Sequence, residues 1–144
     1  MNAALYIWVV HVFGTVYMTG LIWVIQGVHY PLMNRIRSED YVEFQAQHML
    51  RITWVVGPAM LAEAVTALLL VRFAPDFLTW PAALLNLALL SVIWLSTAVY
   101  QVPSHRRLAQ GFDAVAHRRL VQTNWIRTVA WTIRSGLLLY WWIA

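Results

Sequence analysis

The sequence predicts an all-α integral membrane protein, a four-helix bundle with amphipathic cytoplasmic connections. Of its 144 residues, 61% are hydrophobic and 11% are charged, whereas a soluble domain usually has about 25% charged residues. Four apolar stretches of 20 or more residues cover 3–28, 52–73, 81–102 and 124–143. A helix needs about 20 residues to cross the hydrocarbon core. Because four crossings use most of the chain, we expect a single domain over residues 1–144.

Arginine placement predicts the topology. All ten basic residues are Arg, and most lie in the first connection, residues 29–51, and the third, residues 103–123. The second connection, "FAPDFLTWP", is short. Positively charged connections stay in the cytoplasm, so we expect both termini on the non-cytoplasmic side of a bacterial inner membrane. The first stretch lacks a basic region before it, so we expect a retained helix rather than a signal peptide.

The two long connections carry helix signals of their own. In "SEDYVEFQAQHMLR", Asp40 and Glu43 are spaced for a capping box, and we expect this helix to continue into the second membrane helix with a bend near Pro58. The stretch "HRRLAQGFDAVAHRRLVQTNWIR" predicts two helices with a break at Gly111. Tryptophans at helix ends are typical of aromatic belts, which predicts an outer belt of Trp8, Trp80, Trp141 and Trp142 and an inner belt of Trp54 and Trp125.

Composition excludes several classes of function. The chain has no Cys, which excludes disulfides, thiolate metal sites and cysteine nucleophiles. Its net charge of +4 comes from arginines that flank apolar helices, which favours membrane topology over nucleic-acid binding. The expected partners are the lipid bilayer and a hydrophobic small-molecule ligand, with a homo-oligomer as an open alternative.

Three ionisable residues are predicted at one depth inside the membrane. At a rise of about 1.5 Å per residue, His11, Glu63 and Arg134 lie roughly 12–15 Å from the outer boundary. Ser91 of the third apolar stretch falls near this level. Ionisable residues inside a membrane usually face the bundle interior and pair with one another, so we expect Glu63 to contact Arg134, with His11 nearby. This set is either a structural ion pair or a catalytic site.

Polar stripes run from this level toward the cytoplasmic end, at helical spacing on three of the helices. They predict either interhelical hydrogen bonding or a partly polar cavity in which His11, Thr15, Trp94 and Trp131 would hold a cofactor and Trp23, Trp94 and Trp131 would wall an aromatic site. A second polar cluster is expected at the cytoplasmic end: Gln26, His29, His48, Gln101, His105, His117, Asn124 and Arg127. Imidazoles can bind transition metals, which makes His48 and His105 the candidate metal ligands.

The first helix carries a family resemblance. The stretch "LYIWVVHVFGTVYMTGLIWVIQGVHYPL" is similar to the first helix of copper-resistance CopD-type domains and HemJ-type protoporphyrinogen oxidases, and "RITWVVGPAML" is loosely similar to their second-helix entry. The resemblance implies that His11 occupies the position of a haem ligand. Four helices in a chain of this length also resemble the anthrone-oxygenase-like family. These resemblances imply a redox protein or oxygenase.

Two functional hypotheses follow. In the first, a membrane redox protein or oxygenase acts on a hydrophobic, aromatic small molecule with haem or a transition metal. His11 would be its axial ligand or base, Glu63 a proton donor or acceptor, and Arg134 the holder of a carboxylate or oxyanion. In the second, a non-catalytic binding or transport module uses Glu63 and Arg134 to bind an anionic amphiphile. A structural accessory subunit is the third alternative.

Overall fold

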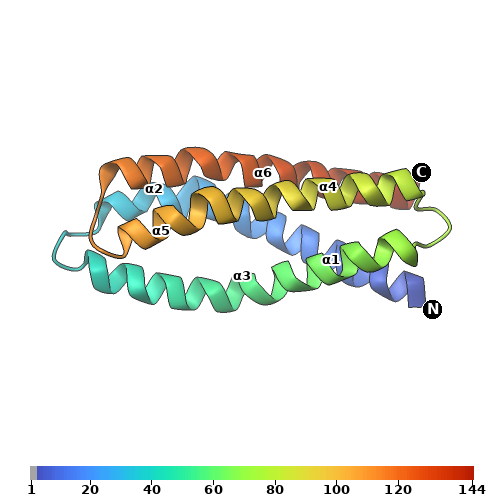
Figure 1. Ribbon diagram of the computed structural model, residues 1–144, viewed down its shortest axis with the longest axis horizontal. Helices are drawn as coiled ribbons and strands as arrows, with labels where there is room; N and C mark the ends of the chain where they lie inside the picture. The colour runs from blue at the N-terminus through green and yellow to red at the C-terminus, as the bar shows by residue number, and fades with distance from the viewer. Residues whose placement is uncertain (1–2) are drawn as a thin grey trace.

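The computed structural model describes residues 3–144, and in that range it consists of helices and their connections. In chain order the elements are α1 (Ala3–Val24), the π-helical η1 (Ile25–His29), α2 (Tyr30–Leu32), the 3-10 helix η2 (Met33–Arg35), α3 (Tyr41–Arg72), α4 (Trp80–Ser96), the π-helical η3 (Thr97–Gln101), α5 (Val102–Leu108) and α6 (Ala114–Ile143). They form four long rods, because η1, α2 and η2 prolong α1 while η3 and α5 prolong α4 (Figure 1). The predicted all-α four-helix bundle is confirmed.

Three of the four rods have the length and apolarity of membrane spans. They cover Ala3–Arg35, Tyr41–Arg72 and Trp80–Leu108. The fourth rod, α6, is also long, with 30 residues, but its arginines lower its mean hydropathy. Two of these arginines, Arg127 and Arg134, are buried and therefore face away from any lipid. Three helices are thus long and apolar enough to cross a membrane, as the sequence predicts, whereas the crossing of α6 stays a prediction.

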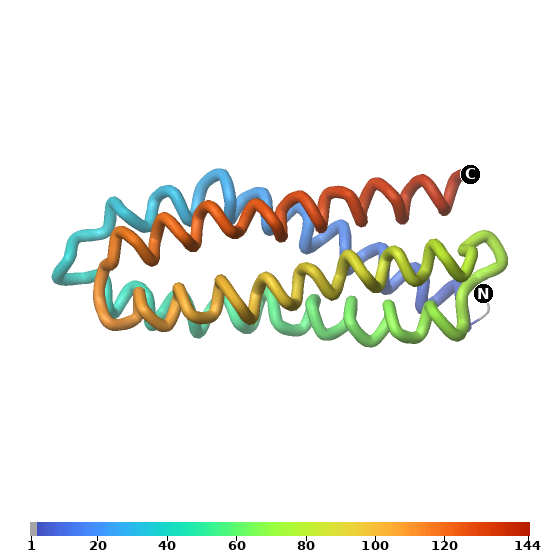
Figure 2. The backbone as a smooth tube through the Cα atoms, turned by 45° about the horizontal axis from the view of Figure 1, so that its top comes forward, coloured from blue at the N-terminus to red at the C-terminus, as the bar shows by residue number. Residues whose placement is uncertain are grey.

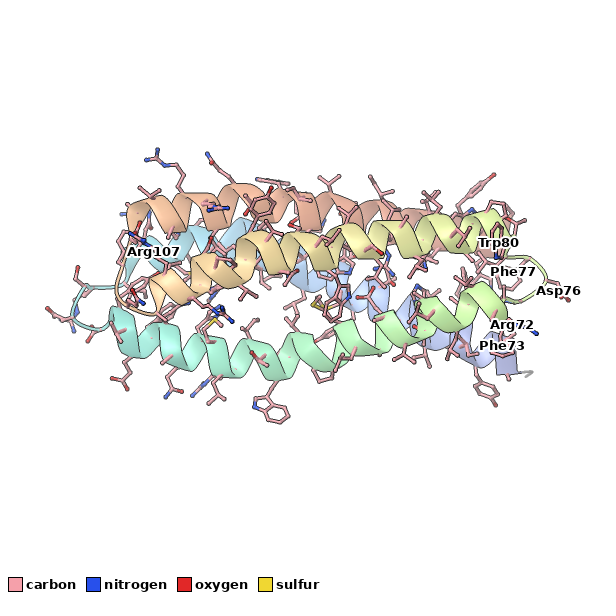
Figure 3. All side chains as sticks on the ribbon, in the orientation of Figure 1. Arg72, Phe73, Asp76, Phe77, Trp80 and Arg107 are labelled. Atoms are coloured by element: carbon pink, nitrogen blue, oxygen red, sulfur yellow. The ribbon has the colours of Figure 1, made fainter. Side chains whose placement is uncertain are left out.

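The two ends of the bundle differ in charge. α1 begins and α6 ends beside the connection between α3 and α4, as both views of the backbone show (Figures 1 and 2). We call this the termini end. The connections 36–40 and 109–113 lie at the opposite end, which we call the arginine end. Figure 3 labels Arg72, Phe73, Asp76, Phe77 and Trp80 at the termini end and Arg107 at the arginine end. The two termini and the short second connection therefore lie at the same end, as predicted. Which end faces the cytoplasm stays a prediction.

The helices at the arginine end are longer than the apolar stretches that predicted them. α3 already begins at Tyr41 and runs unbroken through Pro58, and Figure 1 shows a bend near its middle. Its polar first turns therefore continue the membrane helix, as expected. The predicted capping box is wrong: the Asp40 side chain makes no cap hydrogen bond. It instead accepts a hydrogen bond of 2.9 Å from Arg37 Nε, because an arginine three residues earlier competes for the carboxylate.

The predicted break at Gly111 is confirmed. Gly111 has φ 133°, a conformation that L side chains rarely adopt and glycine tolerates. Asp113 then caps α6, accepting hydrogen bonds of 2.9 Å from the Val115 and Ala116 backbone N–H groups. The Ala116 N–H and the Arg107 side chain hold the pKa of the Asp113 carboxyl below its usual value. This turn reverses the chain from α5 into α6.

The core has two apolar layers with a polar layer between them. The layer at the termini end contains Trp8, Val12, Leu70, Leu78, Ala82, Ala83 and Leu138. The larger layer toward the arginine end includes Met18, Ile22, Met60, Leu90, Ile93 and Leu120. The expected belt position of Trp8 is wrong, since its side chain is fully buried and its ring packs edge-on to Phe77 at 5.2 Å.

Candidate functional site

A buried polar network lies between the two apolar layers and draws one or more residues from each rod. We call it the mid-bundle network, and it contains His11, Thr15, Glu63, Thr66, Asn86, Trp131 and Arg134. Its most exposed member, Thr66, is 7% exposed. The sequence placed His11, Glu63 and Arg134 at this level, and the structure brings all three together.

The centre of the network is an ion pair. Arg134 Nη1 lies 2.6 Å from Glu63 Oε1, and both side chains are 0% exposed. Glu63 also accepts hydrogen bonds from the Thr15 hydroxyl at 2.8 Å and from Trp131 Nε1 at 3.1 Å. The expected Glu63–Arg134 contact is confirmed. A carboxylate with three donors is well satisfied in a medium without water.

His11 joins the network through both ring nitrogens. Asn86 Nδ2 lies 2.9 Å and Arg134 Nη2 lies 3.2 Å from His11 Nε2. Because a guanidinium and an amide nitrogen can only donate, Nε2 is the acceptor and the proton sits on Nδ1. That proton is donated to the Thr66 hydroxyl at 2.7 Å, and this hydroxyl donates onward to the Ala62 carbonyl. His11 is therefore a neutral imidazole with both nitrogens engaged.

This arrangement does not fit haem ligation by His11. An iron atom would need a free nitrogen lone pair, and the Nε2 lone pair is already occupied by donors from Asn86 and Arg134. Of the other expected cofactor residues, Thr15 and Trp131 bond to Glu63. Trp94 does not join them, because it is 38% exposed on the outside of the bundle.

The expected aromatic wall is likewise not assembled. Trp23 is 46% exposed and its ring packs against Trp125 at 5.6 Å, while Trp131 is buried in the network. Trp94 instead lines a shallow outer groove of 490 Å³ together with Ser91, Leu68 and Leu95. A stripe at helical spacing locates one face of a helix, but the tilt of the helix decides which part of that face meets its neighbours.

Sequence reasoning missed Asn86 and selected Ser91 instead. Asn86 donates to His11 and its Oδ1 accepts from Arg134 Nε at 3.1 Å. Ser91 is exposed and donates to the Leu87 carbonyl of its own helix. The available signal was that "WPAALLNLALL" contains a single amide side chain. A depth estimate from helix rise overlooked it because long side chains reach along the bundle axis.

Gly14 explains how close α1 and α3, in the first and second rods, come at this level. A Cβ atom on Gly14 would lie 3.2 Å from Glu63 Cγ, which is tighter than ordinary packing. The absence of a side chain at Gly14 therefore lets Glu63 enter the bundle between its donors.

A second buried polar cluster lies toward the arginine end, and we call it the arginine-end cluster. Its members are Gln26, Tyr30, Gln45, His29, His48, Gln101, His105, Asn124 and Arg127. Asn124 Nδ2 donates to Gln26 Oε1 at 2.8 Å. Gln101 Nε2 donates to the Thr123 hydroxyl at 3.0 Å. The expected second polar cluster is thus present, except that His117 lies at its edge and bonds the Tyr30 carbonyl at 2.8 Å.

Three imidazoles of this cluster form a row. The His29 and His48 rings stack with centroids 4.4 Å apart, and His48 lies 5.4 Å from His105. His105 is engaged on both nitrogens, by the Tyr30 hydroxyl at 3.0 Å and by Gln45 Nε2 at 2.9 Å. Within residues 3–144, no group of three or more His, Cys, Asp or Glu side chains is placed to hold a metal. A metal at His48 and His105 therefore stays a prediction without geometric support.

A groove opens beside the first two imidazoles. It has a volume of 590 Å³, and its walls are His29, Asp40, Glu43, Phe44, Gln47, His48, Arg51, Ile52 and Val55. The Phe44 ring is nearly parallel to the His48 ring, at 6.3 Å and 11°. The groove thus combines aromatic and aliphatic walls with two imidazoles.

The two polar regions differ in how well their atoms are satisfied. Across residues 3–144, the buried side-chain atoms without a hydrogen-bond partner include His29 Nε2, His48 Nε2, Gln45 Oε1, Gln101 Oε1, Asn124 Oδ1 and Arg127 Nε. All six belong to the arginine-end cluster, and none belongs to the mid-bundle network. Since buried polar atoms in native proteins are nearly always paired, the unpaired atoms mark the arginine-end cluster as the candidate functional site.

Comparisons with protein families, curated proteins and solved structures found no match for this chain. The resemblance to CopD-type, HemJ-type and anthrone-oxygenase-like proteins is therefore not tested by them.

Proposed function

We propose that this integral membrane protein binds a flat, hydrophobic small molecule in the groove beside His29 and His48. One observation carries the proposal. The stacked His29–His48 pair lines the groove, and the Nε2 atom of each imidazole has no hydrogen-bond partner among residues 3–144. An imidazole has two nitrogens that need partners. A ligand with a hydroxyl or carbonyl group would supply them.

The groove walls support a flat ligand. Phe44, His48 and His29 present rings that are inclined to one another by 11° to 29°. Flat rings next to one another favour an aromatic ligand that stacks beside them. Ile52 and Val55 add apolar walls. The volume of 590 Å³ lies within the range of about 300–1,000 Å³ typical of small-molecule sites.

The row of imidazoles favours acid–base chemistry at the same place. His48 lies next to His105, with ring centroids 5.4 Å apart, and His105 meets the Tyr30 hydroxyl, so titratable groups lead from the groove toward the interior. A redox or oxygenase reaction of the bound molecule is the second candidate function; these imidazoles would move its protons, and a separate oxidant or redox cofactor would have to take up the electrons. Its residues would be those of the groove rather than His11.

The mid-bundle network has a structural role in this proposal. Its ion pair and its neutral imidazole are saturated with hydrogen bonds, so little is left to bind a ligand. The four rods each contribute a side chain, which fixes their register. Buried polar groups that are fully paired specify one packing arrangement.

We also propose that α6 crosses the membrane and that the arginine end faces the cytoplasm. Because Arg127 and Arg134 are buried inside the bundle, the outer face of α6 at their level can be apolar and can contact lipid. Apart from Arg72 at the termini end, the exposed arginines gather at the arginine end, as the rule for positive charges predicts for the cytoplasmic side. A C-terminal fusion to a reporter that works only in the cytoplasm should be inactive. An active fusion would overturn this orientation.

The binding proposal is tested with 2-naphthol and naphthalene, a pair that differs in one hydroxyl. The protein in lipid nanodiscs should bind 2-naphthol above the level of empty nanodiscs, and about tenfold more tightly than naphthalene, the factor expected for one hydrogen bond in a dry site. His48→Phe keeps a flat ring and should abolish this preference. Ser91→Ala, in the other groove, is the matched control. Equal binding of both probes by wild type and His48→Phe would refute the proposal.

A further inference from the structure

Arg127 is a buried cation that lacks an anionic partner. Its side chain is 5% exposed. Within residues 3–144, ion pairs closer than 4.0 Å join arginines to Glu39, Asp40, Asp113 and Glu63, and none involves Arg127. A charge taken out of water is unfavourable unless it is paired. Arg134, by contrast, has a carboxylate partner, Glu63, at 2.6 Å.

The contacts of Arg127 compensate its charge incompletely. Its guanidinium lies over the Trp131 ring, 5.3 Å from the centroid, and it interacts with the Tyr30 side chain. Its Nε atom is buried without a hydrogen-bond partner. Tyr30 bonds His105, so the other ionisable groups nearby are imidazoles rather than acids. The surroundings of Arg127 are therefore neutral or positive.

Two unpaired acceptors belong to the same cluster. Asn124 lies one turn before Arg127 on α6, and its Oδ1 is buried without a partner, as is Gln101 Oε1. Gln101 belongs to the π-helical η3, and Gln26, which bonds Asn124, belongs to the π-helical η1. π-helical turns are rare and often occur at functional sites. Here the α1 and α4 rods each carry one at the level of the cluster.

We infer that Arg127 anchors a buried oxyanion site, which takes a carboxylate-sized anion. The guanidinium Nε–H would donate to one anion oxygen in a charge-assisted hydrogen bond. The free oxygens of Asn124 and Gln101 would accept from a hydroxyl of the same molecule or from water that accompanies it. The anion is either a free small oxyanion or the carboxylate of a larger molecule that enters from the groove. The side chains of His48, His105 and Tyr30 lie between the groove and Arg127, so a molecule that reaches both places would displace them.

The test compares acetate, 2-naphthoate and the neutral 2-naphthol on protein in nanodiscs, in a low-salt buffer free of other carboxylates and of phosphate. Arg127→Met replaces the guanidinium by an apolar chain, and Arg127→Lys keeps the charge. Arg118→Gln removes an exposed arginine of α6 and is the matched control. Melting temperature and probe affinity are measured for each variant.

Without anion, Arg127→Met should melt at or above the wild-type temperature, because it removes an unpaired buried charge. At least one carboxylate should raise the melting temperature of wild type and of Arg118→Gln but leave Arg127→Met unchanged, and its affinity should drop about tenfold or more in that variant. A response to acetate identifies a free oxyanion, and a response to 2-naphthoate alone identifies a carboxylate carried into the groove. Arg127→Lys should retain part of the response.

Equal carboxylate responses in wild type and Arg127→Met would overturn the inference, and so would a loss of melting temperature in anion-free Arg127→Met. Binding of 2-naphthol reports the groove separately. If 2-naphthol binds while neither carboxylate responds, the oxyanion site is refuted and the groove stands. If a carboxylate responds while 2-naphthol does not bind, the groove proposal fails and the oxyanion site stands.

Discussion

Arg134 and Arg127 lie on one face of α6, seven residues apart, and both are buried. The first is paired with Glu63 and ringed by His11, Asn86 and Thr15. The second has no carboxylate and keeps an unpaired Nε. The two regions have similar residue types, yet the buried polar atoms of the first all have hydrogen-bond partners and several of those in the second do not. Whether every buried polar atom has a hydrogen-bond partner, rather than whether charged groups are present, distinguishes a structural network from a candidate binding site.

The largest expected effect is in the mid-bundle network. Glu63→Gln alone should lower the free energy of unfolding by about 3–5 kcal/mol, because it leaves Arg134 buried without a counter-charge. The double variant Glu63→Gln with Arg134→Met should lose much less, since no lone charge remains. Melting of both single variants and the double variant in detergent forms a double-mutant cycle. Strictly additive losses would show that the two side chains are not coupled.

Close packing at Gly14 gives the next largest effect. Gly14→Ala places a Cβ atom 3.2 Å from Glu63 Cγ, and Glu63 cannot move freely because Arg134, Thr15 and Trp131 hold it. We expect a loss of about 1–3 kcal/mol, the usual range for overpacking. Gly20→Ala is the control, since a Cβ there meets nothing within 4 Å, and it should be neutral or slightly stabilising. Equal melting temperatures for the two variants would show that α1 and α3 separate easily at this level.

A smaller effect is expected at His11, and it sharpens the difference between the two regions. Gln can still accept from Arg134 and donate to Thr66, so His11→Gln should lose about 1 kcal/mol or less. It should bind 2-naphthol like wild type, whereas His48→Phe should not show the hydroxyl preference. Melting and probe binding are measured together with the absorbance spectrum. A Soret band in wild type that disappears in His11→Gln would instead establish His11 as a haem ligand and refute its structural role.

The fold and the Glu63–Arg134 contact could be predicted because the hydrocarbon core of a membrane leaves few alternatives to each. Four long apolar stretches in a membrane can hardly form anything but a helical bundle. Opposite charges at one depth in different helices are strongly favoured to pair, because an unpaired charge in hydrocarbon is costly, and Glu63 and Arg134 do pair. Asn86 and Trp94 were misjudged because helix rise gives depth but neither tilt nor side-chain reach. The unpaired atoms of Arg127, His29 and His48 have no sequence signature at all. Whether a buried polar atom is satisfied depends on neighbours from other rods.

The smallest expected effect concerns the turn into α6, outside both regions. The Asp113 carboxylate caps the helix and bonds Arg107 at 2.7 Å, and its pKa is lowered in the folded protein. A lowered folded pKa means that the charge stabilises the fold above the unfolded value of about 4, and that this contribution disappears as the pH falls through the folded pKa. Asp113→Asn keeps a capping side chain without the charge. Wild type should therefore melt slightly above Asp113→Asn at pH 7, and the difference should shrink toward zero as the solution is acidified below pH 4. A difference that stays constant down to the acid limit would show that the cap acts through its hydrogen bonds alone and that the ion pair with Arg107 contributes nothing.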